Sequence, residues 1–168
     1  MLFIKNLITE NYNFSESTLD LFLKLARKKS YSKNDVIINY NQTPKDIFII
    51  KSGICRSYFF DKNGKESTEH LYFPSASTGS LAALIKGTKS DLMYDCLTDC
   101  EFYVWDYKEI KKLVKTNLEV ANAYSQILES FYLKMSSRIH ELSVLNATER
   151  YLKLKKYIPD IDLLIPQY

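Results

Sequence analysis

The stretch GSLAALIKGTKSDLMYD, which begins at Gly79, has the residue types of a loop that holds a phosphate group. Backbone N–H groups beside a glycine and a short helical turn can bind an anion. The basic residues of the stretch are Lys86 and Lys89. Where a phosphate most needs a cation, the chain has Ser90 and Asp91. The stretch therefore has the glycine and backbone pattern of an anion site, but it lacks a basic residue at the position where a phosphate most needs one.

The other reactive side chains form no catalytic or metal-binding motif. Cys96 and Cys100 have the spacing of half a metal site, but they straddle a strand and a turn, and His70 is distant in sequence. We therefore interpret them, with Cys55, as small buried thiols. Neither His70 nor His140 stands in a motif with a nucleophile, so both are expected to be structural. We expect no enzyme activity, no metal and no cofactor.

Length and composition narrow the class of protein. A chain of 168 residues, 46% of them apolar, is long enough for one well-packed domain. Its formal charge of +3 is too small for a dedicated nucleic-acid binder. An odd count of three cysteines favours a reducing compartment, and no apolar run approaches the length of a membrane span. A cytoplasmic protein that does not contact membranes is expected.

Short β-type runs divided by turn residues occupy the chain from Tyr31 to Trp105, after a short amphipathic helix expected over Ser17–Ala26. This spacing predicts an all-β sandwich or jelly roll. In the segment DKNGK, Asn63 and Gly64 predict a hairpin with a primed turn, in which both residues have positive φ. The six runs are DVIINY, DIFIIK, ICRSYFF, STEHLYF, YDCL and EFYVW.

Helical periodicity replaces the β pattern after Trp105. Asp106 with Glu109, and Asn146 with Glu149, have the spacing of helix N-caps with their N3 partners. We expect one helix after Asp106, a long helix over about Leu118–Leu145, and a third, ATERYLKLKKY, that ends before Pro159.

The long helix carries an apolar stripe that predicts a homodimer. Its members recur at alternating steps of three and four residues, the spacing of a coiled-coil seam. Arg138 is the charged interruption, and we expect it to reach solvent or to meet Glu141 or Glu129. A stripe of this length needs a partner. The predicted interface residues are Ala121, Tyr124, Leu128, Phe131, Met135, Leu142 and Leu145.

This order of elements resembles the Crp/Fnr family of bacterial transcription regulators. The resemblance is carried by SYSKNDVIINYNQTPKDIFIIKSGICRSYFFDKNGKE, with Gly53 and Gly64 at turn positions, by the cassette that begins at Gly79, by VWDYKEIKKL and by NATERYLKL. It implies a mainly β plus α fold. This fold is a cyclic-nucleotide-binding-like β-roll, a double-stranded β-helix or jelly roll, with an N-terminal helix and a long C-terminal dimerisation helix.

The resemblance also implies a domain organisation. Residues 1–116 would form the β-roll with its N-terminal helix and residues 117–145 the dimerisation helix. Residues 146–168 would form a hinge and the start of a winged helix-turn-helix DNA-binding domain that is truncated or absent. DNA would be contacted only through a downstream domain that this chain lacks. The basic side of the last helix is interpreted as a solvated face, in preference to a contact with the phosphate backbone. That side is formed by Lys153, Lys155 and Lys156.

Two departures from the family pattern concern the effector. A cyclic-nucleotide binder of this fold has a carboxylate just after the cassette glycine and an arginine later in the loop. This chain has Ser80 and Ser90 at those positions, followed by Asp91. Losing a charge-assisted contact to phosphate costs about 1.5–3 kcal/mol, so we expect that cyclic AMP does not bind. The effector positions implied by the resemblance are Gly79, Ser80, Leu81, Ser90, Asp91, Met135 and Ser136.

Two alternatives stay open for the pocket and two for the function. The pocket either takes a different, less anionic small molecule or is filled by Leu81, Met93, Tyr94 and Phe131. The chain is expected to be the sensor and dimerisation region of a Crp/Fnr-type DNA-binding regulator. The alternative is a free-standing interaction module of the same fold that does not bind DNA.

Overall fold

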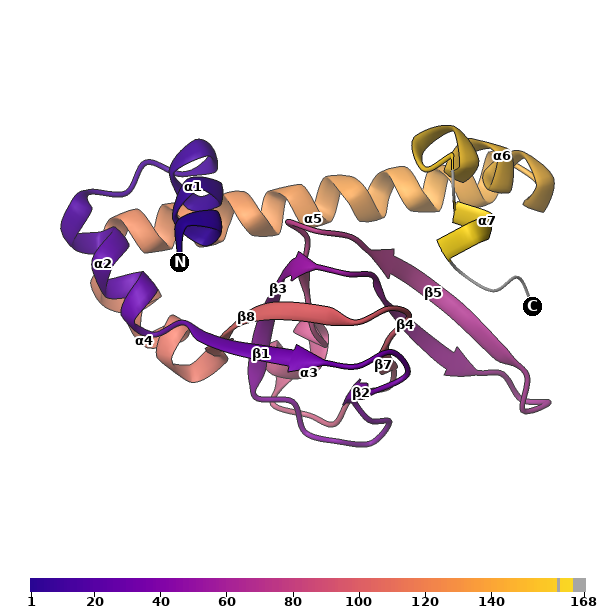
Figure 1. Cartoon of the computed structure of the whole chain (residues 1–168), viewed down its shortest axis with the longest axis horizontal. Helices are drawn as coiled ribbons and strands as arrows, with labels where there is room; N and C mark the ends of the chain where they lie inside the picture. The colour runs from indigo at the N-terminus through magenta and orange to yellow at the C-terminus, as the bar shows by residue number, and fades with distance from the viewer. Residues whose placement is uncertain (160, 165–168) are drawn as a thin grey trace. The chain divides into compact units, whose positions relative to one another are not determined.

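The computed structural model describes residues 1–159 and 161–164 and divides the chain into two compact units, Met1–Val120 and Ala121–Tyr168. The first unit is an eight-stranded β-roll with helices (Figure 1), and the second is helical. Helix α5 (Leu118–Val144) begins in the first unit and continues in the second.

The β-roll consists of two antiparallel four-stranded sheets, with strand orders β1-β8-β3-β6 and β2-β7-β4-β5. These non-consecutive neighbours confirm the predicted jelly roll, because the chain crosses repeatedly from one sheet to the other. The six predicted runs all contain strands, whereas β1 and β6 were not predicted. The bounds are β1 Arg27–Tyr31, β2 Val36–Ile38, β3 Asp46–Ser52, β4 Cys55–Phe60, β5 Glu66–Tyr72, β6 Ser77–Thr78, β7 Met93–Cys96 and β8 Cys100–Asp106.

The hairpin between β4 and β5 is confirmed, but its turn differs from the prediction. Gly64 has a φ of 77°, while Asn63 is not among the residues with positive φ. The amide of Gly64 donates to the Asp61 carbonyl at 3.0 Å, and the Asp61 amide donates to the Lys65 carbonyl at 2.9 Å. The loop is therefore longer than two residues, and a single glycine in the left-handed region closes it. The Asp61 carboxylate accepts from the amides of Asn63 and Lys65 and stabilises this form.

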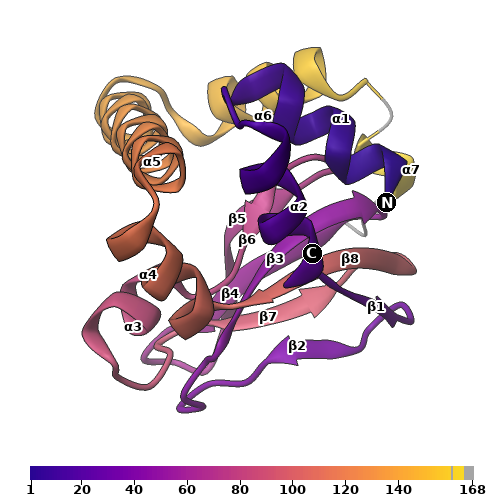
Figure 2. The same ribbon diagram turned by 90° about the vertical axis from the view of Figure 1, so that its left-hand side faces the viewer.

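Helices α1 (Leu2–Asn11), α2 (Glu16–Lys24) and α4 (Tyr107–Thr116) pack with aromatic residues of β8 in a second buried cluster. Figure 2 shows the ribbons of these three helices and of β8. Trp105 is buried in this cluster, and its indole Nε1 donates a hydrogen bond to the Phe22 carbonyl at 3.0 Å. Helix α2 confirms the expected N-terminal helix, whereas α1 was not predicted. As expected, Asp106 caps α4, since its carboxylate accepts from the amides of Lys108 and Glu109.

In the second unit, α5 is followed by α6 (Ala147–Tyr157) and α7 (Ile161–Leu164). The predicted capping pair is confirmed: the Asn146 side chain accepts from the Glu149 amide at 3.0 Å, and the Glu149 carboxylate accepts from the Asn146 amide at 2.8 Å. An ion pair between Lys153 and Glu141 joins α6 to α5. The predicted start of a DNA-binding helix over residues 165–168 lies outside the described residues.

Candidate functional site

The cassette begins with a glycine that the backbone requires. Gly79 has a φ of 132°, and a Cβ at this position would lie 3.3 Å from the Asp46 carbonyl oxygen. Ser80 follows as the N-cap residue of α3 (Leu81–Lys86) and is buried, but its side chain makes no capping bond. Leu81 is half-buried. The predicted cassette therefore forms a glycine turn with a single short helix.

Ser90, which was predicted to stand at the position of the family's arginine, forms hydrogen bonds within its own loop. Ser90 is only 1% exposed. Its Oγ donates to the Leu92 carbonyl at 2.8 Å and accepts from the Leu92 amide at 3.3 Å. Its amide donates to the Gln42 carbonyl at 2.8 Å. Asp91, the next residue, is exposed. Ser90 and Asp91 therefore supply neither a cation nor a free hydroxyl to a phosphate.

Nearby arginines are also engaged with carboxylates. On β4, the Arg56 guanidinium donates from Nε and Nη2 to Asp95 at 2.9 and 3.0 Å, and from Nη1 to Glu66 at 2.6 Å. On β1, Arg27 pairs with Asp46 at 2.6 Å. A bidentate carboxylate pair satisfies the guanidinium donors that a phosphate would otherwise use. Arg56 is thus not available as a substitute for the missing arginine, whereas Arg27 makes a single contact, from Nη2 to Asp46, and its side chain is 53% exposed.

Hydroxyl groups line the inner side of the roll behind the cassette. Ser57 on β4 is fully buried, and its Oγ lies 3.4 Å from the Tyr72 hydroxyl. The Tyr94 hydroxyl donates to the Gly79 carbonyl at 3.3 Å, and the rings of Tyr72 and Tyr94 lie 6.3 Å apart. Burial raises the pKa of both tyrosines, so they are neutral hydrogen-bonding groups.

Thr78 adds a buried hydroxyl whose hydrogen bonding is incomplete. It ends β6 immediately before the cassette and lies beside Cys55 and Tyr72. Within the described part of the chain, Thr78 Oγ1 has no partner in hydrogen-bonding geometry. A buried polar atom without a partner costs about 1–3 kcal/mol and marks a place where a ligand or an ordered water can bind.

Glu69 is a site residue that the sequence reasoning missed. In the register of β4 with β5, Ser57 pairs with His70 and Tyr58 with Thr68, so Glu69 has no strand partner and forms a β-bulge. Bulges re-aim side chains. Here the bulge lets the Glu69 carboxylate accept from the buried Ser57 Oγ at 3.1 Å. The only local signal was an acidic residue inside the β-type run STEHLYF.

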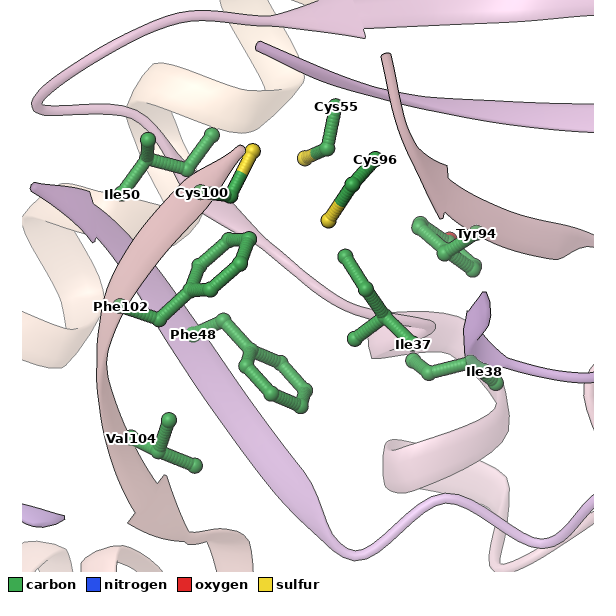
Figure 3. Close-up of a cluster of buried hydrophobic side chains, with 10 residues drawn as sticks. All are labelled: Ile37, Ile38, Phe48, Ile50, Cys55, Tyr94, Cys96, Cys100, Phe102 and Val104. Carbon is green, nitrogen blue, oxygen red and sulfur yellow. The ribbon is translucent and has the colours of Figure 1, made fainter. Parts of the chain in front are cut away.

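The three thiols belong to the hydrophobic core, and Figure 3 shows Cys100 beside Ile50 and Cys96 above Ile37, with Cys55 in the same cluster. All three are free and buried, as the sequence predicted. Burial raises the pKa of Cys55 to about 12, and a hydrogen bond with Cys100 together with burial raises that of Cys96. Among the described residues, no group of three His, Cys, Asp or Glu side chains is suited to a metal ion.

The thiols are therefore expected to resist alkylation in the folded protein. A pKa raised from 9.0 to about 12 lowers the thiolate fraction of Cys55 about a thousand-fold. The hydrogen bond with Cys96 lowers the pKa of Cys100, so the protection of Cys100 comes from its burial, which blocks access to the sulfur. Iodoacetamide labelling followed by mass spectrometry should show little modification in buffer and complete modification at all three cysteines in denaturant. Rapid labelling of the native protein would contradict the structural role.

Met135 and Ser136, the effector positions implied for the long helix, lie in the second unit and are exposed there. Their contact with an effector stays a prediction. Phe131, which was considered as a residue that fills the pocket, is half-buried in the same unit.

Part of the predicted dimer stripe is exposed. The exposed apolar stripe differs from the predicted one at two positions, each by one residue. Met135 and Leu142 are exposed, and they are joined by Tyr132 beside Phe131 and by Ile139 where Arg138 was expected. The remaining predicted members are half-buried: Ala121, Tyr124, Leu128, Phe131 and Leu145.

Arg138 itself behaves as expected. Its guanidinium lies 3.9 Å from the Glu141 carboxylate and its side chain is partly exposed, so no unpaired charge is buried. None of the helices in the described ranges is long and apolar enough to cross a lipid bilayer.

Comparisons with known proteins agree on the fold. A family model described as "Cyclic nucleotide-binding domain" matches residues 28–117, more than half of the chain. No curated protein matches the chain in sequence at a significant level.

Solved structures similar to this chain include bacterial regulators. A putative Crp/Fnr-family transcriptional regulator from Eubacterium rectale has a TM-score of 0.71 and 15% identity over 89% of this chain and 69% of its own. The catabolite activator protein of Thermus thermophilus has a TM-score of 0.65 and 18% identity over 78% of this chain and 61% of its own.

A third similar structure is the c-di-GMP-responsive global regulator CLP of Xanthomonas campestris, with a TM-score of 0.63 and 16% identity over 83% of this chain and 70% of its own. At these identities the likeness is one of fold. The match spans less than two thirds of the Thermus protein's length.

Proposed function

Because the chain belongs to the cyclic nucleotide-binding domain family, we propose that it is the sensor and dimerisation region of a Crp/Fnr-type transcription regulator whose effector is not cyclic AMP. The fold it shares with bacterial regulators supports the regulator class. The observation that carries the effector claim is Ser90, which is buried and bonded to Leu92 where the family's arginine would bind phosphate.

Recognition of a small molecule fits the hydroxyl-lined interior better than catalysis does. Ser57, Tyr72, Thr78 and Tyr94 supply donors and acceptors, while the pKa values of both tyrosines are raised. A general base needs a pKa near the operating pH, and these hydroxyls are far from it. We therefore assign this interior to binding and not to chemistry on a substrate.

The exposed stripe of α5 supports a homodimer. Tyr132, Met135, Ile139 and Leu142 recur at steps of three and four residues, and all four are exposed in the single chain. Soluble proteins seldom leave such a stripe in water, and a two-fold partner presents an identical stripe to cover it. A two-fold dimer would also present two downstream DNA-binding domains symmetrically.

Cyclic AMP and cyclic GMP at millimolar concentration are expected to leave the protein unchanged. Ser80 and Ser90 lack the carboxylate and guanidinium of a cyclic-nucleotide site, and Asp91 opposes an anion. Titration calorimetry and thermal unfolding should give no binding heat and no rise in Tm. A clear isotherm with either nucleotide would overturn the effector claim.

The regulator class has an independent test in the gene. Reading the encoding DNA past Tyr168 should reveal an in-frame basic, helical segment long enough for a helix-turn-helix. The protein carrying that segment should bind DNA with a strong dependence on salt concentration. A stop codon directly after Tyr168 would instead favour the free-standing interaction module.

A further inference from the structure

We propose that the hydroxyl-lined interior takes a small hydroxylated amine, with Glu69 pairing with the ammonium group and Thr78 bonding a ligand hydroxyl. This inference rests on the proposed sensor function and names its effector class. It reverses the charge expected of a cyclic-nucleotide site.

The charge of the site comes from Glu69. Its Oε2 accepts one hydrogen bond, from the Ser57 Oγ at 3.1 Å. Across residues 1–159 and 161–164, no lysine or arginine forms an ion pair with this carboxylate. A carboxylate has about four lone-pair sites, so most of its acceptor capacity is available. An ammonium group supplies donors and the opposite charge, whereas a phosphate would be repelled.

The bulge supplies a structural reason for this arrangement. In a regular β5, successive side chains would point to opposite faces of the sheet, so two adjacent residues such as Glu69 and His70 would not both lie at Ser57. The skipped register at Glu69 brings both Glu69 and His70 to Ser57, one through its side chain and the other through strand pairing. Because β5 is an edge strand and Glu69 is exposed, this end of the site opens to solvent.

Thr78 is the independent sign of a ligand. The residue is only 6% exposed, and its Oγ1 lacks a partner among the described residues. A threonine hydroxyl can donate one hydrogen bond and accept others. Tyr72 lies beside Thr78 and also within 3.4 Å of Ser57, so Tyr72 connects the orphaned hydroxyl to the carboxylate side. A ligand that carries both an amine and a hydroxyl matches the two ends of this cluster.

A metal ion is the less suitable cation. Ions such as Ca²⁺ take six or more oxygen ligands, several of them charged. The described residues contain no group of three His, Cys, Asp or Glu side chains suited to metal binding. With one carboxylate and several hydroxyls, the cluster is better matched to an organic cation.

The test compares small molecules that share a three-carbon skeleton with hydroxyl groups but differ in net charge. Thermal unfolding of the whole chain would be followed with serinol, glycerol and glycerol phosphate, which are respectively cationic, neutral and anionic, and with ethanolamine as a smaller amine. Serinol is expected to raise Tm saturably, glycerol much less at equal concentration, and glycerol phosphate not at all. Cyclic AMP serves as the separate probe of the proposed function.

Two variants locate the site. Glu69→Gln keeps the shape and removes the charge, and it is expected to weaken serinol binding about ten-fold to a hundred-fold. Thr78→Val removes the orphaned hydroxyl, so it should raise Tm without ligand and still weaken serinol binding. Lys62→Gln, on the exposed hairpin loop, is the matched control and should leave both quantities unchanged.

The outcomes separate this inference from the proposed function. No saturable response to serinol or ethanolamine, or a response that Glu69→Gln leaves intact, would overturn the amine site while leaving the sensor and dimer proposals standing. Binding of cyclic AMP with no response to amines would overturn both the amine site and the effector claim. A serinol response lost in both variants would support the inference.

Discussion

The double variant Met135→Asp with Ile139→Asp is expected to convert the proposed dimer into a monomer. Its dimer dissociation constant should be at least about a thousand-fold higher than that of the wild type. Both side chains are apolar and lie on the stripe of α5, where they are 57% and 62% exposed in the single chain. Each change removes an apolar contact, worth about 1.5–3 kcal/mol when buried. A two-fold interface contains each change twice and brings four like charges together.

Sedimentation velocity over a range of concentrations measures the effect directly. The same helix offers a matched control in Leu133→Asp with Val144→Asp, because these residues are 66% and 62% exposed. At about 100° per residue they lie on roughly the opposite side of the helix from Met135 and Ile139. The control pair should sediment as the wild type does. A wild type that is monomeric at tens of micromolar would show that the stripe needs no second copy.

Ser90→Arg is expected to destabilise the protein by at least about 3 kcal/mol and not to restore binding of cyclic AMP. The position is 1% exposed, so a guanidinium there would be buried without a carboxylate partner. The change also breaks both bonds between the Ser90 hydroxyl and Leu92. For a chain of this size, 3 kcal/mol corresponds to a fall in Tm of roughly 6–12 °C.

Ser90→Ala separates the lost hydrogen bonds from the buried charge. It removes the contacts with Leu92 without adding volume or charge, so it should cost about 1–2 kcal/mol. Chemical unfolding in urea measures both variants. If Ser90→Arg proved as stable as the wild type, or bound cyclic AMP when combined with Ser80→Glu, the cassette would be an open phosphate site and our interpretation of Ser90 would be wrong.

The sequence alone determined the features whose energetics are local. Alternating apolar residues predicted six of the strands, and the caps at Asp106 and Asn146 were identified because each cap bonds within three residues of itself. The hairpin at Gly64 was predicted for the same reason. Its turn type was not, because Asp61 and Lys65 close a longer loop than a primed turn uses.

Strand β1 and helix α1 were missed because their stability comes from distant partners. The segment RKKSY has no alternating apolar pattern, and it becomes a strand by pairing with β8 over Arg27–Tyr31. Ile4 and Ile8 of α1 are buried in the cluster around Trp105, about a hundred residues away in the chain. Such long-range packing leaves little trace in a short window of sequence.

The chemistry of the candidate site was decided by tertiary structure in the same way. From the sequence, Ser90 was predicted to replace the family's arginine, but only the fold shows that its hydroxyl donates a hydrogen bond to the Leu92 carbonyl. Glu69 joins the site because strand pairing skips it, and register depends on where a whole strand meets its neighbour. The sequence determined which charge was absent, whereas the folded chain determined which groups occupy the site, because burial and bulges arise only when distant strands meet.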